Sequence, residues 1–188
     1  MKVLVACEYS GIVRDAFANA GHDAMSCDVL PSETAGKHYQ GDVRDVLDFS
    51  WDLVIAHPPC TRLTLAGVRW LHERNLWPDL DQACDFFKLF IGCAPKVAIE
   101  NPQPHRYAVD RIGRNYDQKI QPWQFGHGES KGICLWLEGL PPLIATDVVE
   151  GREQKVWRMP PSADRAKARS RFFAGIAQAM AQQWGSTG

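Results

Sequence analysis

The stretch Asp52-Leu-Val-Ile-Ala-His57-Pro-Pro-Cys60-Thr-Arg62 decides the fold. Leu53 to Ala56 is a short, continuous apolar run, which is typical of a strand buried on both faces of a sheet. The two prolines cannot donate ladder hydrogen bonds, so the strand must stop and deliver Cys60 just beyond its end. Ligands of open α/β sheets bind beyond the carboxyl ends of the strands, where chemistry would be done. The alternative is that Cys60 is a small buried hydrophobe, the usual role of a reduced cysteine.

Strand and helix patterns alternate on both sides of this stretch. We expect strands over 2–6, 23–27 and 96–99, helices over 12–20 and 81–93, and a polar loop over 29–40. This alternation predicts an α/β fold: a Rossmann-like, doubly wound, mostly parallel sheet with helices on both faces. The length of 188 residues fits one domain, and we see no boundary that would divide 1–188.

The C-terminal third contributes two further strand candidates and a helix. The runs 120–125 and 132–137 predict strands, joined by the Gly-rich polar loop 126–131, which could reach into a site. From Ser162, an N-cap candidate, a last helix is predicted to about Trp184, with Phe172 on its apolar face. Its first turns hold four basic residues, either a solvated face or a phosphate contact: Arg165, Lys167, Arg169 and Arg171.

Composition narrows the class of protein. A formal net charge of -1 argues against broad electrostatic coating of duplex DNA, although a local basic stripe stays open. None of the six cysteines forms a C-x-x-C pair, so we expect no metal and no dithiol redox site. Met1 to Ala6 is too short for a signal sequence, and no apolar run approaches membrane-spanning length. We therefore expect a reduced protein of the cytoplasm, or of the host cytoplasm if phage-encoded, without membrane contact.

Polar residues follow each predicted strand and should meet at one edge of the sheet. They are Glu8, Ser10 and Gly11, then Asp28, then Asp42 and Val43, then His57, Pro58 and Cys60, and finally Glu100 and Asn101. An acid at the end of the second strand is where a ribose hydroxyl is held in nucleotide-type sites. The loop after the first strand is where a cofactor would pass close to the backbone, although a single glycine is a weak signal.

The order of these residues resembles the DNA cytosine-5 methyltransferases, which use S-adenosylmethionine on a Rossmann-like sheet. Pro58-Pro59-Cys60 meets the family's Pro-Pro-Cys, and Glu100-Asn101 meets its Glu-Asn. Asp28 matches the acid that holds the cofactor ribose, and Gly41-Asp42 the pair that holds the adenine amine. Nearly the whole chain resembles the short members encoded in phage and prophage genomes. The resemblance implies the S-adenosylmethionine-dependent methyltransferase fold and a cofactor site made by Glu8, Ser10, Gly11, Asp28, Asp42, Val43, His57 and Pro58.

The resemblance also implies a reaction. A thiolate of Cys60 adds to carbon 6 of cytosine, which turns carbon 5 into a nucleophile towards a methyl donor. Glu100 would act as the acid at ring nitrogen 3, and Lys131 would stabilise the exocyclic oxygen. Candidate substrate contacts are Asn101, Arg62, His127 and Trp70. His57 is expected to be a packed or cofactor-facing histidine, and His127 a better candidate for touching substrate.

The segment after Cys60 interleaves aromatic and basic side chains: Trp70 and Trp77 with Arg62, Arg69, His72 and Arg74. Such a segment could stack a base and clamp its phosphates, or it could be an ordinary capping helix whose tryptophans fill the core. Enzymes that methylate exocyclic amines carry an aromatic residue where this chain has cysteine, and we discount that class.

The chain departs from the family in three places. The first loop lacks Phe-x-Gly-x-Gly-Gly, the loop arginines are missing, and 140–161 leave room only for a connector where the family carries a target-recognition region. We therefore expect action on unpaired or loosely recognised DNA, on a free pyrimidine nucleotide, or with a partner protein that supplies recognition. The donor could also be another one-carbon compound. The alternative is a non-catalytic descendant that binds a nucleotide, a cofactor or a protein partner.

Overall fold

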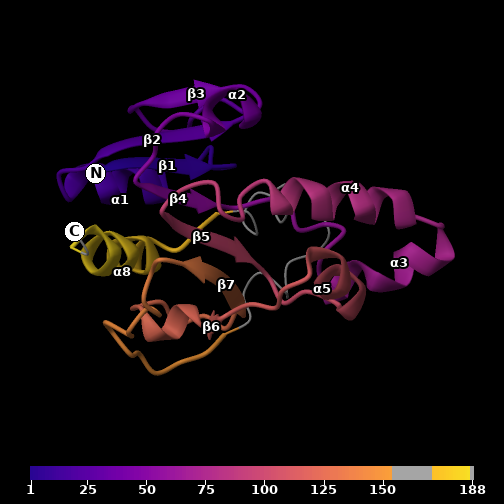
Figure 1. The fold of residues 1–188 in the computed structure, drawn as a ribbon. Helices are drawn as coiled ribbons and strands as arrows, with labels where there is room; N and C mark the ends of the chain where they lie inside the picture. Colours follow the sequence, from indigo (N-terminus) through magenta and orange to yellow (C-terminus); the bar gives the residue numbers. More distant parts are fainter. Residues whose placement is uncertain (154–170, 187–188) are drawn as a thin grey trace.

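The computed structural model describes residues 1–153 and 171–186, and these form a seven-stranded sheet in the order β3-β2-β1-β4-β5-β7-β6 (Figure 1). The strands are β1 Lys2–Ala6, β2 Asp23–Asp28, β3 His38–Gln40, β4 Leu53–Ala56, β5 Lys96–Asn101, β6 Gln118–Ile120 and β7 Ile133–Glu138. Strands β1 to β5 pair in parallel, whereas β7 is antiparallel to both β5 and β6. The predicted doubly wound, mostly parallel sheet is confirmed.

Helices cover both faces of this sheet (Figure 1). They are α1 Ile12–Asn19, α2 Arg44–Leu47, α3 Val68–Glu73, α4 Trp77–Lys88, α5 Arg106–Ile112 and α8 Ala174–Gly185, with 3-10 turns η1 Leu65–Gly67 and η2 Pro122–Gln124. Side chains of a strand alternate between faces, and β1 follows this rule. Val3 and Val5 pack with the core under α1 and α8, and Leu4 and Ala6 pack with the core under α4 and α5.

In two of the predicted elements, a proline places a boundary at a different residue from the predicted one. The strand predicted over 120–125 is wrong beyond Ile120, because Pro122 opens the 3-10 turn η2, which is held by a capping box between Gln121 and Gln124. The helix predicted over 81–93 begins earlier, at Trp77, since Pro78 has the φ angle of a first helical turn. It ends at Lys88, five residues before the predicted end.

The predicted last helix is also corrected. Its proposed N-cap Ser162 and the basic residues Arg165, Lys167 and Arg169 lie outside the described residues. Within the described part, α8 begins at Ala174, and Phe172 precedes it in non-helical backbone. A Cβ on Gly175 would collide with the carbonyl oxygen of Phe125, so the small residue allows the close approach that fixes the start of the helix.

Shorter elements went unpredicted. The loop predicted over 29–40 contains β3, three residues long, and α5 follows β5 with His105 as its N-cap. Over the ranges that the structure describes, no helix has both the length and the apolar character to cross a membrane.

Candidate active site

A cavity of about 230 Å³ opens at the carboxyl ends of β1, β2, β4 and β5. Nine of the predicted site residues line it: Glu8, Ser10, Asp28, His57, Pro58, Cys60, Glu100, Asn101 and Lys131. The lining also includes Pro59 of the Pro-Pro-Cys motif and Arg171, for which the sequence left a phosphate contact open. It further includes four residues that were not predicted there, Cys7, Tyr9, Leu30 and Pro102, and Phe172, which was predicted only on the apolar face of the last helix. Parallel strands deliver their ends to the same edge, and this is why residues nearly a hundred positions apart meet here.

The turn that carries Cys60 is held from the neighbouring strand. Asn101, only 1% exposed at the end of β5, donates its amide to the carbonyl oxygen of Pro58 at 2.8 Å. The Cys60 carbonyl accepts the backbone N–H groups of Leu63 and Thr64, which closes the turn. The Cys60 thiol itself is partly exposed and stands outside any disulfide. The two prolines therefore end the strand, and Asn101 fixes where the turn lies.

His105 holds the other side of this turn and escaped prediction. Its backbone N–H donates to the Leu63 carbonyl at 3.0 Å, and its Nε2 donates to the Arg62 carbonyl at 2.8 Å. Its Nδ1 accepts from the backbone N–H of Ala108, so the same ring caps α5. Burial lowers the pKa of His105, which favours the neutral ring that this bonding requires. The one signal in the sequence was its position between Pro104 and a helical run.

Two cysteines, Cys7 and Cys60, line the cavity. Burial raises the pKa of Cys7 to about 12, and the nearby Asp28 carboxylate adds to the effect. Cys7 also has a backbone φ of 59°, in the left-handed region. A thiol with this pKa holds almost no thiolate near neutral pH, so Cys7 is unsuited to nucleophilic attack.

The raised pKa of Cys7 predicts how fast this thiol reacts with an alkylating reagent. At pH 8 its thiolate fraction is about 10⁻⁴, so we expect Cys7 to react with iodoacetamide about 10²-fold more slowly than an ordinary thiol, after allowing for the greater nucleophilicity of a basic thiolate. A labelling time course with peptide mass spectrometry measures this rate. The control is the same reaction in urea, where Cys7 should react like the other cysteines. Equal rates in folded and unfolded protein would contradict the prediction.

His57 and Glu100 form a pair across β4 and β5. Ala56 pairs with Ile99 in the register of the two strands, and the next residue of each strand brings the two side chains together. Nδ1 of His57 lies 3.2 Å from Oε2 of Glu100, and each side chain is 13% exposed. The ring of Phe172 packs on the imidazole with 4.9 Å between centroids. The predicted acid therefore has a fixed histidine partner.

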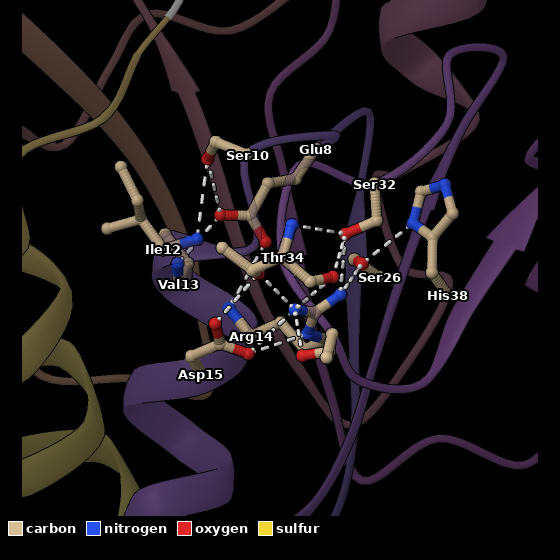
Figure 2. Close-up of polar contacts among 11 residues, drawn as sticks. Glu8, Ser10, Ile12, Val13, Arg14, Asp15, Ser26, Ser32, Thr34 and His38 are labelled. Carbon is tan, nitrogen blue, oxygen red and sulfur yellow. Dashed lines mark hydrogen bonds and ion pairs between the residues drawn. The ribbon is translucent and has the colours of Figure 1, made fainter.

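Glu8 caps helix α1 with its carboxylate (Figure 2). Oε1 accepts the backbone N–H of Val13 at 2.7 Å, and Oε2 accepts that of Arg14 at 3.1 Å. The Ser10 hydroxyl donates to Oε1 at 3.2 Å. The free N–H groups of a helix start are an anion site, and here a side chain of the chain itself fills it. Glu8 and Asp28 make the side of the cavity after β1 and β2 acidic, while Lys131 and Arg171 also belong to the cavity lining.

Replacing Glu8 tests this capping role. We expect Glu8→Ala to lower the free energy of unfolding by about 2 kcal/mol, because two backbone donors at the start of α1 lose a buried charged acceptor. Glu8→Gln keeps one acceptor oxygen and should lose less. Urea denaturation of the three proteins measures the order, and equal stability of Ala and parent proteins would show that water replaces the cap.

Arg14 ties the loop 29–37 to α1 and was not predicted. It is 1% exposed, and its guanidinium donates to Ser26, Ser32 and Thr34 side chains and to the carbonyl of Ala35 (Figure 2). Asp15 balances its charge at 2.8 Å. This loop carries Leu30 to the cavity and Glu33 to an ion pair with Arg171, 2.8 Å apart. One buried arginine thus shapes one wall of the site.

Gly11 lies at the centre of this arrangement and outside the cavity lining. Its φ of 76° is in the left-handed region, and a Cβ there would collide with the Thr34 hydroxyl and with the Arg14 guanidinium. The packing of the loop 29–37 on α1 therefore requires a glycine at position 11. Its predicted cofactor contact stays a prediction.

The other predicted residues outside the cavity lining have partners elsewhere. Asp42 pairs with Arg44, whose backbone N–H lowers the pKa of Asp42, and Val43 is 4% exposed in the core. Arg62 pairs with Asp79 at 3.1 Å on α4. His127 accepts the backbone N–H of Gly175 at 2.9 Å at the start of α8, so it supports the segment beside the cavity.

Trp70 lies on α3, away from the lining. The guanidinium groups of Arg69 and Arg74 each lie 4.2 Å from its ring centroid, one cation–π contact on each side. Trp77 instead packs against His72 and Tyr107, as in the alternative interpretation of a capping segment. Within the described residues, no group of three or more His, Cys, Asp and Glu side chains is arranged to hold a metal ion.

No protein-family model matches the chain, and no curated protein matches it. Among solved structures, it resembles a protein described as a DNA modification methyltransferase, encoded within prophage Cp of E. coli: TM-score 0.52, 14% identity, 86% of this chain and 56% of that one. The S. pombe Dnmt2 methyltransferase aligns at TM-score 0.45 and 16% identity, over 84% of this chain and 54% of that one. The chain spans a little over half the length of these proteins. It has the fold of S-adenosylmethionine-dependent methyltransferases.

Proposed function

We propose that this protein transfers a methyl group from S-adenosylmethionine to carbon 5 of cytosine in DNA, through a covalent bond between Cys60 and carbon 6. The observation that carries the proposal is one cavity lined by both Cys60 and Glu100, on a sheet with the methyltransferase fold. Cys60 and Glu100, a thiol and an acid at adjacent strand ends, both lie outside the hydrophobic core and face the same cavity. Covalent pyrimidine chemistry uses both.

The acidic half of the cavity fits the proposed cofactor. S-adenosylmethionine carries a sulfonium cation and no phosphate, and the Glu8 carboxylate already satisfies the start of α1, where a phosphate would bind in nucleotide sites. Asp28 ends β2, the position of a ribose-binding acid, and Leu30 adds an apolar wall. When bound, the cofactor supplies an electrophilic methyl group. Glu8, Ser10, Asp28 and Pro58 are the residues that we propose to hold it.

The residues of the chain would act in a fixed order. The Cys60 thiolate forms a bond to carbon 6, and the electron pair of the 5,6 double bond moves into the ring. Glu100, as the acid, donates a proton to ring nitrogen 3 and removes the negative charge that the addition creates. Lys131, which lines the same cavity, would stabilise the exocyclic oxygen. Asn101 keeps the Pro58–Cys60 turn in place through its amide.

We propose unpaired or loosely recognised DNA as the substrate. A base inside a duplex must be flipped out before it reaches Cys60, and an unpaired base costs less to capture. Outside the cavity lining, Arg69, Trp70 and Arg74 form a cation–π stack at which we propose that a base or a phosphate of the bound strand binds. Sequence recognition would then come from a partner protein or would be absent.

Nucleoside mass spectrometry tests the proposal. The protein is incubated with S-adenosylmethionine and either single- or double-stranded DNA, and the digested DNA is analysed for 5-methylcytosine. We expect new 5-methylcytosine, with more from the single strand. If folded protein modifies neither DNA, the next arms are dCMP and RNA, and no product from any of the four substrates would refute the proposed activity.

A further inference from the structure

His57 lies where the two halves of the site meet. In the sheet, β4 stands between β1 and β5. The residues proposed to hold the cofactor follow β1 and β2, and Glu100 follows β5. His57 follows β4, so it stands between the acids on one side and Glu100 on the other. A group at this position would lie between the proposed sites of the methyl donor and of the ring that accepts the methyl group.

The contact of Nδ1 with Glu100 orients the imidazole of His57, whereas Nε2 has no hydrogen-bond partner within the described residues. We assign the hydrogen of the neutral ring to Nδ1, which lies 3.2 Å from Oε2 of Glu100, and this assignment leaves a lone pair on Nε2. Nε2 is one of two buried side-chain polar atoms without a hydrogen-bond partner in the described residues; the other is Oδ1 of Asn101. A buried polar atom without a hydrogen-bond partner destabilises the folded state. Both atoms belong to residues that line the cavity, which points to a ligand as their missing partner.

We propose that Nε2 of His57 is the base that removes the proton from carbon 5 after methyl transfer. This inference rests on the proposed function. In the step, the carbon 5–hydrogen bond breaks and its proton goes to Nε2. The freed electron pair forms the 5,6 double bond, and the bond between carbon 6 and Cys60 breaks to return the thiolate. Nitrogen 3 gives its proton back to Glu100, and the proton on His57 passes to water.

Glu100 supports His57 during this step. After Glu100 has donated its proton to ring nitrogen 3, it is a carboxylate 3.2 Å from Nδ1. When Nε2 then takes the carbon 5 proton, the imidazolium faces this carboxylate across a charge-assisted hydrogen bond. A base oriented by a carboxylate is the arrangement by which histidine accepts protons in other nucleophilic enzymes. One pair would thus supply the acid for the first step and the base for the last.

Phe172 governs access to Nε2. Its ring packs on the imidazole, and the cavity of about 230 Å³ is smaller than the roughly 300–1,000 Å³ of ordinary ligand pockets. Substrate would therefore reach Nε2 by displacing Phe172. Phe172 is only 9% exposed and packs with the core under α1 and α8, so this displacement has a cost in packing.

The test is trapping of the adduct on ordinary cytosine. His57→Asn keeps an amide donor for Glu100 near the position of Nδ1 and removes the Nε2 base. Parent protein should turn over and leave little protein–DNA adduct after denaturation. In His57→Asn we expect release from the adduct to slow by about 10²- to 10⁴-fold, so that a denaturation-resistant protein–DNA band accumulates with S-adenosylmethionine present. His57→Gln is the second variant, and thermal unfolding confirms that both are folded.

Separate outcomes decide the two proposals. Parent protein incubated with 5-fluorocytosine DNA, which lacks the carbon 5 hydrogen, must form a stable adduct if the proposed function holds, and no adduct there overturns the function. Given that adduct, accumulation on ordinary cytosine in the His57 variants supports the base. Variants that turn over like the parent without accumulating adduct overturn it. Variants that form no adduct even on 5-fluorocytosine DNA also overturn it, since His57 would then act before the base is needed.

Discussion

Cys60→Ala is expected to abolish methyl transfer, by about 10⁴-fold or more, while the protein stays folded. The covalent route needs a thiolate at carbon 6, and the second thiol of the cavity, Cys7, cannot replace it because burial raises its pKa to about 12. Cys60 is partly exposed at a turn held mainly by backbone groups and by Asn101. Its side chain contributes little to the core, so stability should change by less than about 1 kcal/mol.

Incorporation of labelled methyl groups into DNA measures the activity, and urea denaturation measures the stability. The matched control is Cys93→Ala, which removes a partly buried cysteine after α4, outside the cavity lining, and should keep full activity. Residual activity in Cys60→Ala near that of Cys93→Ala would mean that methyl transfer proceeds without the thiol. In that case no covalent pyrimidine adduct would form for Glu100 to protonate, and a role for Glu100 as an acid would require a different substrate.

Arg14→Met is expected to give a large loss of stability, about 3–5 kcal/mol. Methionine fills similar space but leaves the Asp15 carboxylate without its cation, and the Ser26, Ser32 and Thr34 side chains without a donor. Because the same contacts hold the loop 29–37, the wall that carries Leu30 and Glu33 should loosen. Affinity for S-adenosylmethionine should therefore fall with the stability.

Urea denaturation and calorimetric titration with S-adenosylmethionine measure both effects. Arg44→Met is the control, since Arg44 pairs with Asp42 at 2.8 Å but both side chains are about half exposed. An exposed pair of this kind contributes about 0–1 kcal/mol. If Arg14→Met unfolded at the same urea concentration as Arg44→Met, the buried hydrogen bonds of Arg14 would not contribute to the free energy of unfolding. The loop 29–37 would then be held by its own turns.

The strands β1, β2, β4, β5 and β7 were predictable from short runs rich in apolar residues, whereas the polar strand β3 was missed and β6 was predicted too late in the chain. Leu53 to Ala56 shows this most clearly, since every residue is fully buried and the next two after His57 are prolines. Arg14 was not predictable, because its partners Ser26 and Thr34 come from segments with no pattern that points to α1. A buried arginine among apolar helix positions could not be told from one on a solvated face.

The positions of candidate site residues were predictable where these residues directly follow a strand. Residues that directly follow strands, such as Glu8, Asp28 and Glu100, line one cavity, because parallel strands carry their ends to one edge. Residues chosen from loop composition, such as Arg62 and His127, were not brought to it. Their partners are set by tertiary packing, which composition does not encode. The His57–Glu100 pair depends on the register of β4 and β5, which the sequence alone does not fix.

The most direct measurement is intact-protein mass spectrometry after incubation with S-adenosylmethionine and a single-stranded oligonucleotide that contains 5-fluorocytosine. We predict a denaturation-resistant adduct whose mass equals protein plus oligonucleotide plus one methyl group, with the attachment mapped to the peptide that contains Cys60. No adduct from folded protein, or attachment at a different residue, would contradict the covalent mechanism that we propose.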